Sequence, residues 1–476
     1  MKLPKNKTKI VCTIGPASES PEVLKRMIKA GMNVARINFS HGDFSDHARV
    51  IKKVRAAARK AKRRVAIMGD LPGPKMRIGE FSEEPIELKP GDSFCLTTRD
   101  IVGDNSRVSV SFSRLPKAVK KGDSLFLNDG IIELRVNKVE GKDVHCLVRV
   151  GGELRSRKGL NLPGIDLGIS AFTRRDHECL KFAMEQGVDA VSQSFVETAA
   201  DIRAVRKAAD KLGHKPFIIA KIERADALDH MGEIVQAADG IMVARGDLGV
   251  EIPIAQIAVV QKGLMQQANR AGKPVITATQ MLESMTNNRR PTRAEATDVA
   301  NAILDGTDCV MLSGESAMGQ YPIDAVKMLA EIAAAAEPHR PRYRLEEALK
   351  TYGRDGDITL TDLISLSVET TLARVTPAAL IVPTGSGYTA TMISRFKLPV
   401  WITAVSRHEK TCQGLAFSYG VYPVHKPERP DDWKPFARKW LKDHKIKGNI
   451  VVLTEGPSER NPESNNRLEL IDLRRG

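Results

Sequence analysis

Short apolar runs alternate with helical patterns along most of this chain, and that alternation constrains its fold more than any other feature. The runs Lys9–Ile14, Asn33–Ile37 and Val65–Ile67 are separated by the helical patterns Pro21–Ala30 and Asp46–Arg59. Neighbouring parallel strands need a long crossover connection, which a helix usually supplies. The beginning of the chain is therefore predicted to be a β-α-β-α-β unit built on a parallel sheet.

A different pattern follows the third run. Leu71–Pro74 interrupts the alternation, and the strand patterns beyond it are short and separated by frequent turn signals. These signals are Pro90–Asp92, Gly122–Asp123, Asn128–Gly130 and Glu140–Asp143. Residues 72–167 are therefore predicted to form an inserted all-β domain.

Five further strand patterns, each preceded by a helical one, follow the insertion. They are Ala190–Gln193, Phe217–Lys221, Gly240–Ala244, Val275–Ala278 and Cys309–Leu312. With the first three they predict an α/β fold, a (β/α)8 (TIM) barrel formed by residues 1–71 and 168–338 and interrupted after its third strand. A doubly wound open sheet is the alternative, and it is the weaker one because no G-x-G-x-x-G sequence opens a helix.

The remainder of the chain forms a separate unit. Residues 339–357 are polar and rich in proline and arginine, which is typical of a linker. Residues 358–476 alternate again between strand and helix patterns and are predicted to form a C-terminal open α/β sheet domain. Three domains agree with a length of 476 residues at roughly 150 residues per domain.

Ionisable and hydroxyl side chains gather at the predicted carboxyl ends of the barrel strands, where (β/α)8 enzymes carry their working residues. Glu223 and Asp247 end adjacent strands, and two carboxylates at that separation suit Mg²⁺ or Mn²⁺. Lys221 shares a strand face with Glu223 and suits the stabilisation of a phosphoryl or enolate charge. A structural ion pair in the barrel mouth is the alternative. The other polar residues at these ends are Arg36, Asn38, Ser40, His41, Asp70, Arg245, Thr279 and Ser313, and Gly246 lets a ligand approach the backbone closely.

Several long segments resemble the signatures of the pyruvate kinase family. The resemblance is strong across the barrel, moderate across the β insertion and weaker over the C-terminal domain. The segments that carry it are Thr8–Pro16, Gly31–Gly42, Ile219–Glu223, Arg245–Glu251, Thr277–Met285 and Pro291–Glu295.

The resemblance implies that the chain transfers the phosphoryl group of phosphoenolpyruvate to ADP, giving pyruvate and ATP. It implies that Lys221 stabilises the phosphoryl group in flight, that Arg36 contacts it, and that Thr279 and Ser313 help to protonate the enolate. The metal ligands implied are Glu223 and Asp247. The substrate carboxylate is expected at Gly246, Asp247 and Thr279, and the nucleotide at Arg77, Lys158 and His41.

One departure from the family pattern concerns the monovalent cation. Many members carry Asp-Thr-Lys-Gly-Pro-Glu after the third strand, whereas this chain has Asp70-Leu71-Pro72-Gly73-Pro74-Lys75. Members with the glutamate generally require K⁺, held in the region that corresponds to Asn38, Ser40 and Asp70. Leu71 cannot ligate a cation and Lys75 carries its own positive charge. We therefore hypothesise that the Lys75 ammonium replaces K⁺, so that K⁺ is not required; an exposed loop lysine is the alternative.

The C-terminal domain contains a loop similar to family effector sites. Thr384, Ser386, Gly387 and Thr389 follow a predicted strand and suit a phosphorylated allosteric effector, while an ordinary strand-to-helix turn is the alternative. The family also implies a homotetramer and a β domain that moves as a lid over the nucleotide.

The charge of the chain permits other classes of function. The sequence has 73 Lys and Arg against 58 Asp and Glu, a formal net charge of +15. That excess suits a non-catalytic phosphate or nucleic-acid binder, but no nucleic-acid-binding motif accompanies it, and a solvated helix face is the better interpretation. The best support for such a binder is the basic helix that contains Lys52, Lys53, Arg55, Arg59, Lys60, Lys62, Arg63 and Arg64. The nearest enzymatic alternative is another metal-dependent phosphoenolpyruvate or 2-oxo-acid barrel enzyme.

The remaining composition indicates a cytoplasmic protein. No apolar stretch approaches the ~20 residues of a membrane helix, and no secretory h-region follows the charged beginning of the chain. Six scattered cysteines indicate reduced thiols. We expect neither nucleic-acid nor membrane partners.

Overall fold

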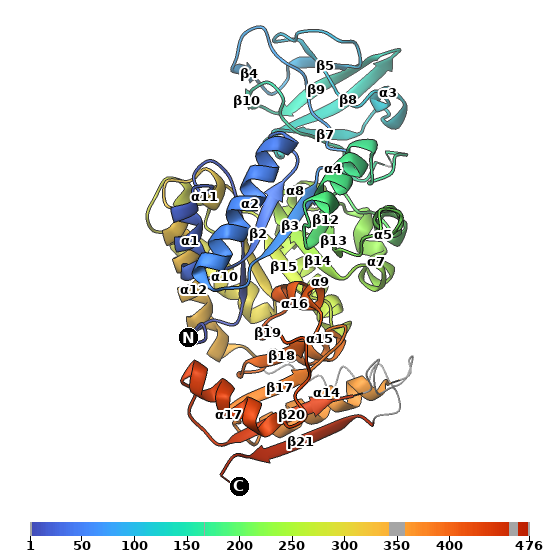
Figure 1. Ribbon diagram of the computed structural model, residues 1–476. Helices are drawn as coiled ribbons and strands as arrows, with labels where there is room; N and C mark the ends of the chain where they lie inside the picture. The colour runs from blue at the N-terminus through green and yellow to red at the C-terminus, as the bar shows by residue number, and fades with distance from the viewer. Residues whose placement is uncertain (1, 166, 342–357, 457–464, 475–476) are drawn as a thin grey trace.

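The computed structural model describes residues 2–165, 167–341, 358–456 and 465–474. A barrel occupies the middle of the molecule, with an all-β unit at one end and a second α/β sheet at the other (Figure 1). Most of the predicted linker, residues 342–357, lies outside the described residues. No helix in the described ranges is long and apolar enough to span a membrane.

Eight parallel strands close into a barrel in the order β1-β16-β15-β14-β13-β12-β3-β2. The closed sheet confirms the predicted (β/α)8 barrel, and the open doubly wound alternative was wrong. Apolar and β-branched side chains fill both faces of most strands, as expected where helices cover the outside. The strands are β1 (Lys9–Thr13), β2 (Met32–Asn38), β3 (Ala66–Leu71), β12 (Ala190–Gln193), β13 (Phe217–Ile222), β14 (Gly240–Ala244), β15 (Val275–Ala278) and β16 (Cys309–Leu312).

Helices surround the barrel, and side-chain caps fix where several of them begin. Thr173 and Asp176 form a capping box at the start of one helix, and Thr292 and Glu295 do so at another. The helical pattern that precedes the strand Gly240–Ala244 predicts one helix near residues 227–237; the structure has two short helices there, since the chain leaves helical hydrogen bonding at His230. The helices are α1 (Pro21–Ala30), α2 (Phe44–Ala61), α4 (Arg174–Glu185), α5 (Ala199–Lys211), α6 (Asp226–Asp229), α7 (Met231–Ala237), α8 (Arg245–Glu251), η1 (Ile254–Gln256), α9 (Ile257–Arg270), η2 (Glu283–Thr286), α10 (Arg293–Asp305), α11 (Gly314–Ala317), α12 (Pro322–Ala336) and η3 (Glu337–His339).

The inserted unit follows β3 and has a hydrophobic core of its own, with Phe94, Leu125 and Leu134 among its fully buried members. Its larger sheet has the order β11-β7-β8-β9-β5-β6, and its smaller one pairs β10 with β4. Its elements are β4 (Ile86–Leu88), β5 (Ser93–Thr97), β6 (Arg107–Ser109), α3 (Leu115–Ala118), β7 (Ser124–Leu127), β8 (Ile132–Glu140), β9 (Asp143–Val150), β10 (Gly152–Leu154) and β11 (Leu160–Asn161).

The C-terminal sheet has the order β19-β18-β17-β20-β21, and β21 alone is antiparallel to its neighbour. Its strands are β17 (Ala379–Pro383), β18 (Ile402–Ser406), β19 (Val421–His425), β20 (Ile450–Glu455) and β21 (Arg467–Asp472). The helices that cover it are α14 (Leu360–Leu372), α15 (Tyr388–Ser394), α16 (Glu409–Gly414), η4 (Leu415–Phe417) and α17 (Trp433–His444).

A buried polar junction joins this domain to the amino-terminal face of the barrel. Asp308, just before β16, lies 2.6 Å from the Lys397 Nζ and accepts a hydrogen bond of 2.8 Å from the Tyr419 N–H. The opposite face of the barrel, where the strands end, therefore faces the inserted unit (Figure 1).

Candidate active site

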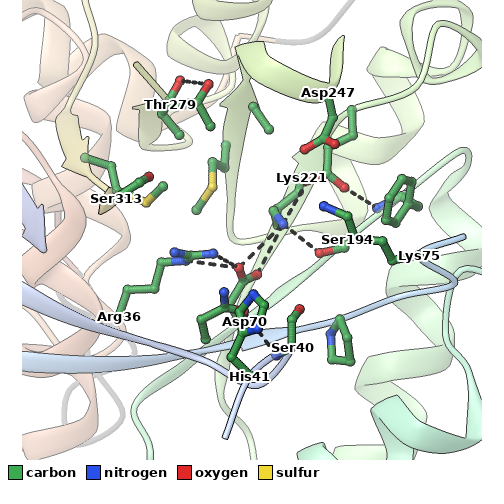
Figure 2. Close-up of a pocket in the computed structure, with 18 of the residues that line it drawn as sticks. Arg36, Ser40, His41, Asp70, Lys75, Ser194, Lys221, Asp247, Thr279 and Ser313 are labelled. Carbon is green, nitrogen blue, oxygen red and sulfur yellow. Dashed lines mark hydrogen bonds and ion pairs between the residues drawn. The ribbon is translucent and has the colours of Figure 1, made fainter. Parts of the chain in front are cut away.

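A polar cavity of about 110 Å³ lies at the carboxyl ends of the barrel strands (Figure 2). Most of the residues predicted from the strand ends meet there, in side chains from the barrel and from the segment that leads into the insertion. Those that line it are Arg36, Asn38, Ser40, His41, Asp70, Lys75, Arg77, Lys221, Glu223, Asp247, Thr279 and Ser313.

Asp70, at the end of β3, is the anion around which the cavity is organised. Arg36 donates to its Oδ2 from Nε at 3.0 Å and from Nη2 at 2.5 Å, and the Ser192 hydroxyl donates to Oδ1 at 2.6 Å. Burial alone would raise the pKa of this carboxyl, but the charges of Lys221 and Arg36, with these hydrogen bonds, lower it to about 2. Asp70 is therefore ionised at any working pH.

Lys221, on β13, is held between three oxygen-bearing groups. Its Nζ lies 2.8 Å from the Glu223 Oε1 and 3.4 Å from the Asp70 Oδ1, and it donates to the Ser194 Oγ at 2.6 Å. Burial would lower its pKa, but the charges of Asp70 and Glu223 outweigh burial and raise it. The ammonium therefore stays protonated in a largely buried position, where its charge acts with little screening.

Glu223 and Asp247 face the same cavity from neighbouring elements, as the sequence predicted. Glu223 is buried, and its Oε2 accepts a hydrogen bond of 2.7 Å from the Phe195 N–H. Burial and the nearby Asp247 carboxylate raise the pKa of Glu223, against the opposing charge of Lys221. Within the described ranges no cluster of three or more His, Cys, Asp or Glu forms a metal site. Two carboxylates suit a cation that completes its coordination with water and substrate oxygens.

Thr279 sits just after β15 in a left-handed backbone conformation, with φ of +67°. Its Oγ1 accepts a hydrogen bond of 2.8 Å from the Gly246 N–H and donates to the Ala278 carbonyl at 2.7 Å. Thr279 lines the cavity, whereas Gly246 does not, and the Gly246 N–H is engaged by the Thr279 side chain. Ser313, at the end of β16, also lines the cavity, and its N–H donates to the Glu315 Oε2 at 2.7 Å. The positive φ of Thr279 strains its backbone, as it does for any non-glycine residue, and such strain concentrates at functional sites.

Cations gather on the side of the cavity that faces the insertion. Burial lowers the pKa of His41, and the charges of Arg77, Lys75 and Arg36 lower it further. Lys158 is not among the residues that line the cavity, and its carbonyl accepts from the Ile78 N–H within the insertion.

Ser192 and Ser194, at the end of β12, are site residues that the sequence reasoning missed. Ser194 directly follows the predicted strand Ala190–Gln193, so the strand-end rule, applied to the fourth strand, would have identified it. Ser192 lies within the predicted strand Ala190–Gln193 rather than after it, and carries no such signal. Its role follows only from the register that pairs Ser192 with Asp70.

The loop between β17 and α15 carries the predicted effector residues. The Gly387 N–H donates to the Thr384 Oγ1 at 2.9 Å, and the Tyr388 N–H donates to the Ser386 Oγ at 3.3 Å. Gly387 adopts φ of +92°, which favours glycine. In this structure the hydroxyls of Thr384 and Ser386 accept from the loop's own backbone; Thr389 lies in the first turn of α15.

The closed barrel, its carboxyl-end cavity and the pairing of a buried lysine with two carboxylates define a (β/α)8-barrel enzyme. Residues 5–326 match the family profile described as "Pyruvate kinase, barrel domain", and residues 362–471 match "Pyruvate kinase, alpha/beta domain". The chain belongs to the pyruvate kinase family and is a phosphotransferase.

Relatives from distant organisms support this assignment. The chain is 51% identical to a pyruvate kinase of Thermococcus litoralis over 426 residues, which cover 89% of each protein. It is 43% identical to one of Geobacillus stearothermophilus over 467 residues, 95% of this chain and 78% of the relative. A Clostridium perfringens pyruvate kinase is 42% identical over 417 residues, 87% of this chain and 88% of the relative.

Proposed function

We propose that the chain transfers the phosphoryl group of phosphoenolpyruvate to ADP and releases pyruvate and ATP. The observation that carries the proposal is the protonated Lys221 between Asp70 and Glu223, in a cavity shared with Arg36 and Asp247. Phosphoryl transfer depends on positioning and charge stabilisation, and most of the side chains that line this cavity are charged or hydrogen-bonding groups that can supply both.

A divalent cation, Mg²⁺ or Mn²⁺, fits Glu223 and Asp247. Burial and the neighbouring Asp247 disfavour the ionised form of Glu223, and a bound cation would offset that cost. When bound, the cation would neutralise charge on the phosphoryl and substrate oxygens.

Side chains of the chain itself stabilise the transferring phosphoryl group, protonate the enolate and bind the substrate carboxylate. Lys221 and Arg36 stabilise the charge on the phosphoryl group while its bond to the enol oxygen breaks and a bond to the terminal phosphate oxygen of ADP forms. The enolate then takes a proton at carbon, delivered through Thr279 and Ser313, to give pyruvate. The substrate carboxylate lies against Gly246, Asp247 and Thr279; Gly246 reaches it by exchanging its bond to Thr279.

The nucleotide phosphates lie against Arg77, Lys158 and His41 in this proposal. Arg77 donates from Nη1 to the Arg157 carbonyl at 2.9 Å, so the cavity wall and the Lys158 segment are directly connected. Movement of the inserted domain, residues 72–167, brings Lys158 to the nucleotide as a lid closes. The barrel domain then comprises residues 1–71 and 168–338, and residues 358–476 form the C-terminal domain.

We infer that Lys75 takes the place of K⁺. Lys75 lines the cavity together with Asn38, Ser40 and Asp70, and its side chain extends into it (Figure 2). Leu71 is fully buried and offers no oxygen ligand from its side chain. Activity in buffer free of Na⁺ and K⁺ should equal that with K⁺; a collapse of rate restored by K⁺ would refute the assignment.

A coupled assay with phosphoenolpyruvate, ADP and Mg²⁺ tests the reaction. Lys221→Ala should lose activity by a factor of about 100 to 1,000 or more, while Lys211→Ala, an exposed lysine on α5, should match the parent. Pyruvate formation that needs no ADP would instead indicate another phosphoenolpyruvate or 2-oxo-acid barrel enzyme. An unchanged rate in Lys221→Ala would overturn the proposed chemistry.

Assembly and regulation belong to the same proposal. Ile254, Val259, Leu360, Leu363 and Leu470 are exposed apolar side chains on the barrel and the C-terminal domain, and we propose that they are covered in a homotetramer. Light scattering on the purified chain tests this.

A phosphorylated effector at Thr384, Ser386, Gly387 and Thr389 should change the phosphoenolpyruvate saturation curve, and Ser386→Ala should weaken that response.

A further inference from the structure

A second cavity, of about 320 Å³, lies far from the barrel mouth. It is lined by Lys2, Leu3 and Lys7, which precede β1, by the start of β17, by the segment just before β18 and by the end of α17 with the residues that follow it. Figure 1 shows the beginning of the chain at the junction of the barrel and the C-terminal domain, near α17. We infer that this cavity is a binding site for a planar aromatic anion.

Aromatic side chains form a fixed wall of the cavity. Trp401 and Trp440 line it, and Tyr422 packs edge-on between them with ring centroids 6.0 Å and 5.3 Å away. His444, which also lines the cavity, lies against Trp440 in a tilted arrangement, with ring centroids 3.7 Å apart. Trp440 is buried, whereas Trp401 is half-buried, with the Lys9 Nζ 4.9 Å from its ring centroid. Rings held by one another in this way lose little freedom on binding, and the exposed part of Trp401 suits a flat aromatic group.

Basic side chains surround this aromatic wall. Lys2, Lys7 and Lys445 line the cavity, and none of the described residues that line it is acidic. Lys445 is exposed at the end of α17, and the Lys7 ammonium is 3.9 Å from its acidic neighbour Glu337, a loose pair. An apolar ligand with one negative charge therefore meets the exposed ammonium of Lys445 and the basic side chains of Lys2 and Lys7, whereas a neutral ligand of the same shape gains only stacking.

The size of the cavity supports a ligand site rather than a packing gap. The cavity, of about 320 Å³, falls within the roughly 300–1,000 Å³ of small-molecule sites.

Isothermal titration of the full chain with naphthalene carboxylate tests the site, because this probe combines a flat ring with one charge. We expect saturable one-to-one binding, and at least tenfold weaker binding of naphthalene carboxamide, its neutral analogue. Equal affinity for the two probes, or no saturable binding of the carboxylate at millimolar concentration, would overturn the inference.

Two substitutions locate the binding. Trp401→Leu should weaken the binding of naphthalene carboxylate at least tenfold, because it removes the ring on which the probe stacks. Lys445→Asn should weaken the binding about threefold. Asparagine is chosen because the backbone at Lys445 is left-handed, with φ of +55°, a conformation that asparagine tolerates. Lys442→Gln, an exposed lysine on the same helix outside the cavity, is the matched control. Unchanged affinity in both Trp401→Leu and Lys445→Asn would place binding elsewhere; circular dichroism and phosphotransferase rate confirm folding.

Discussion

Arg36 donates two hydrogen bonds to the same oxygen of Asp70, from Nε at 3.0 Å and from Nη2 at 2.5 Å. The pair joins β2 to β3, whose register places Asn38 opposite Asp70. Asp70 also lies within 3.4 Å of the Lys221 Nζ, so one carboxylate orients two of the cations proposed to act on the phosphoryl group. Orientation fixed before the substrate binds is what electrostatic catalysis requires.

Asp70→Asn should therefore lower kcat by about 100- to 1,000-fold, because the amide keeps the shape of the side chain and loses the charge that positions Arg36 and Lys221. The control is Asp189→Asn, since Asp189 pairs with Arg55 at 2.9 Å away from the cavity. Both variants should lose free energy of unfolding, measured by denaturant titration, but Asp189→Asn should keep its kcat. A kcat in Asp70→Asn equal to that of the control would contradict the role of Asp70.

The stability of the folded chain should depend on Asp70 below neutral pH. Its folded pKa, about 2, lies below its ordinary value of 3.8, so the stabilisation is present above pH 3.8 and is lost as pH falls through 2. Ser192→Ala removes one hydrogen bond that favours the carboxylate and should cost about 1 kcal/mol of unfolding free energy at pH 7. The difference from the parent should shrink toward pH 2; an equal difference at pH 7 and pH 2 would exclude linkage through Asp70.

The monovalent-cation hypothesis predicts that substitutions can make the activity dependent on K⁺. In the double variant Leu71→Thr/Lys75→Glu a hydroxyl and a carboxylate replace an apolar side chain and an ammonium, so activity should become dependent on added K⁺. The single variant Lys75→Glu lacks the added hydroxyl ligand and should be less active than the double variant in K⁺. Initial rates across a K⁺ titration, with a tetramethylammonium salt holding ionic strength constant, give the measurement. A double variant as active without K⁺ as with it would contradict the hypothesis.

The barrel was predictable because its strands are short buried segments, most of them apolar, and each crossover needs a helix. Lys221, Glu223 and Asp247 were predictable for a related reason, since parallel strands end on one rim and polar residues there have few structural uses. The division of residues 227–237 at His230 was not predictable, because nothing in an apolar periodicity reports a local break in backbone hydrogen bonding.

Contacts between distant strands were also beyond a reading of the sequence. Ser192 meets Asp70 across the β3–β12 register although the two are 122 residues apart in the chain, and no local pattern encodes that pairing. The same holds for Gly246, whose position at a strand end was predictable but whose amide is taken by Thr279. Sequence patterns specify which residues reach the rim, while the hydrogen bonds among them depend on packing.

Gly69 precedes Asp70 on β3, and the ring of Phe39 packs where a side chain would be. A Cβ at Gly69 would lie 2.6 Å from the Phe39 Cε2 and 3.0 Å from its Cζ. Phe39 is itself buried against Phe182, with ring centroids 5.8 Å apart, so it cannot move aside freely. Gly69→Ala should therefore cost about 1–3 kcal/mol of unfolding free energy and lower kcat, because β3 carries Asp70.

Phe39→Leu removes the ring atoms that the new methyl group would meet. Alone it should destabilise the chain by loss of packing, but in the Gly69→Ala background it should recover part of the stability and of kcat. The double-mutant cycle, measured by denaturant titration and by steady-state kinetics, should therefore give a favourable coupling of about 0.5–3 kcal/mol. Strictly additive losses would mean that the space above Gly69 does not position Asp70.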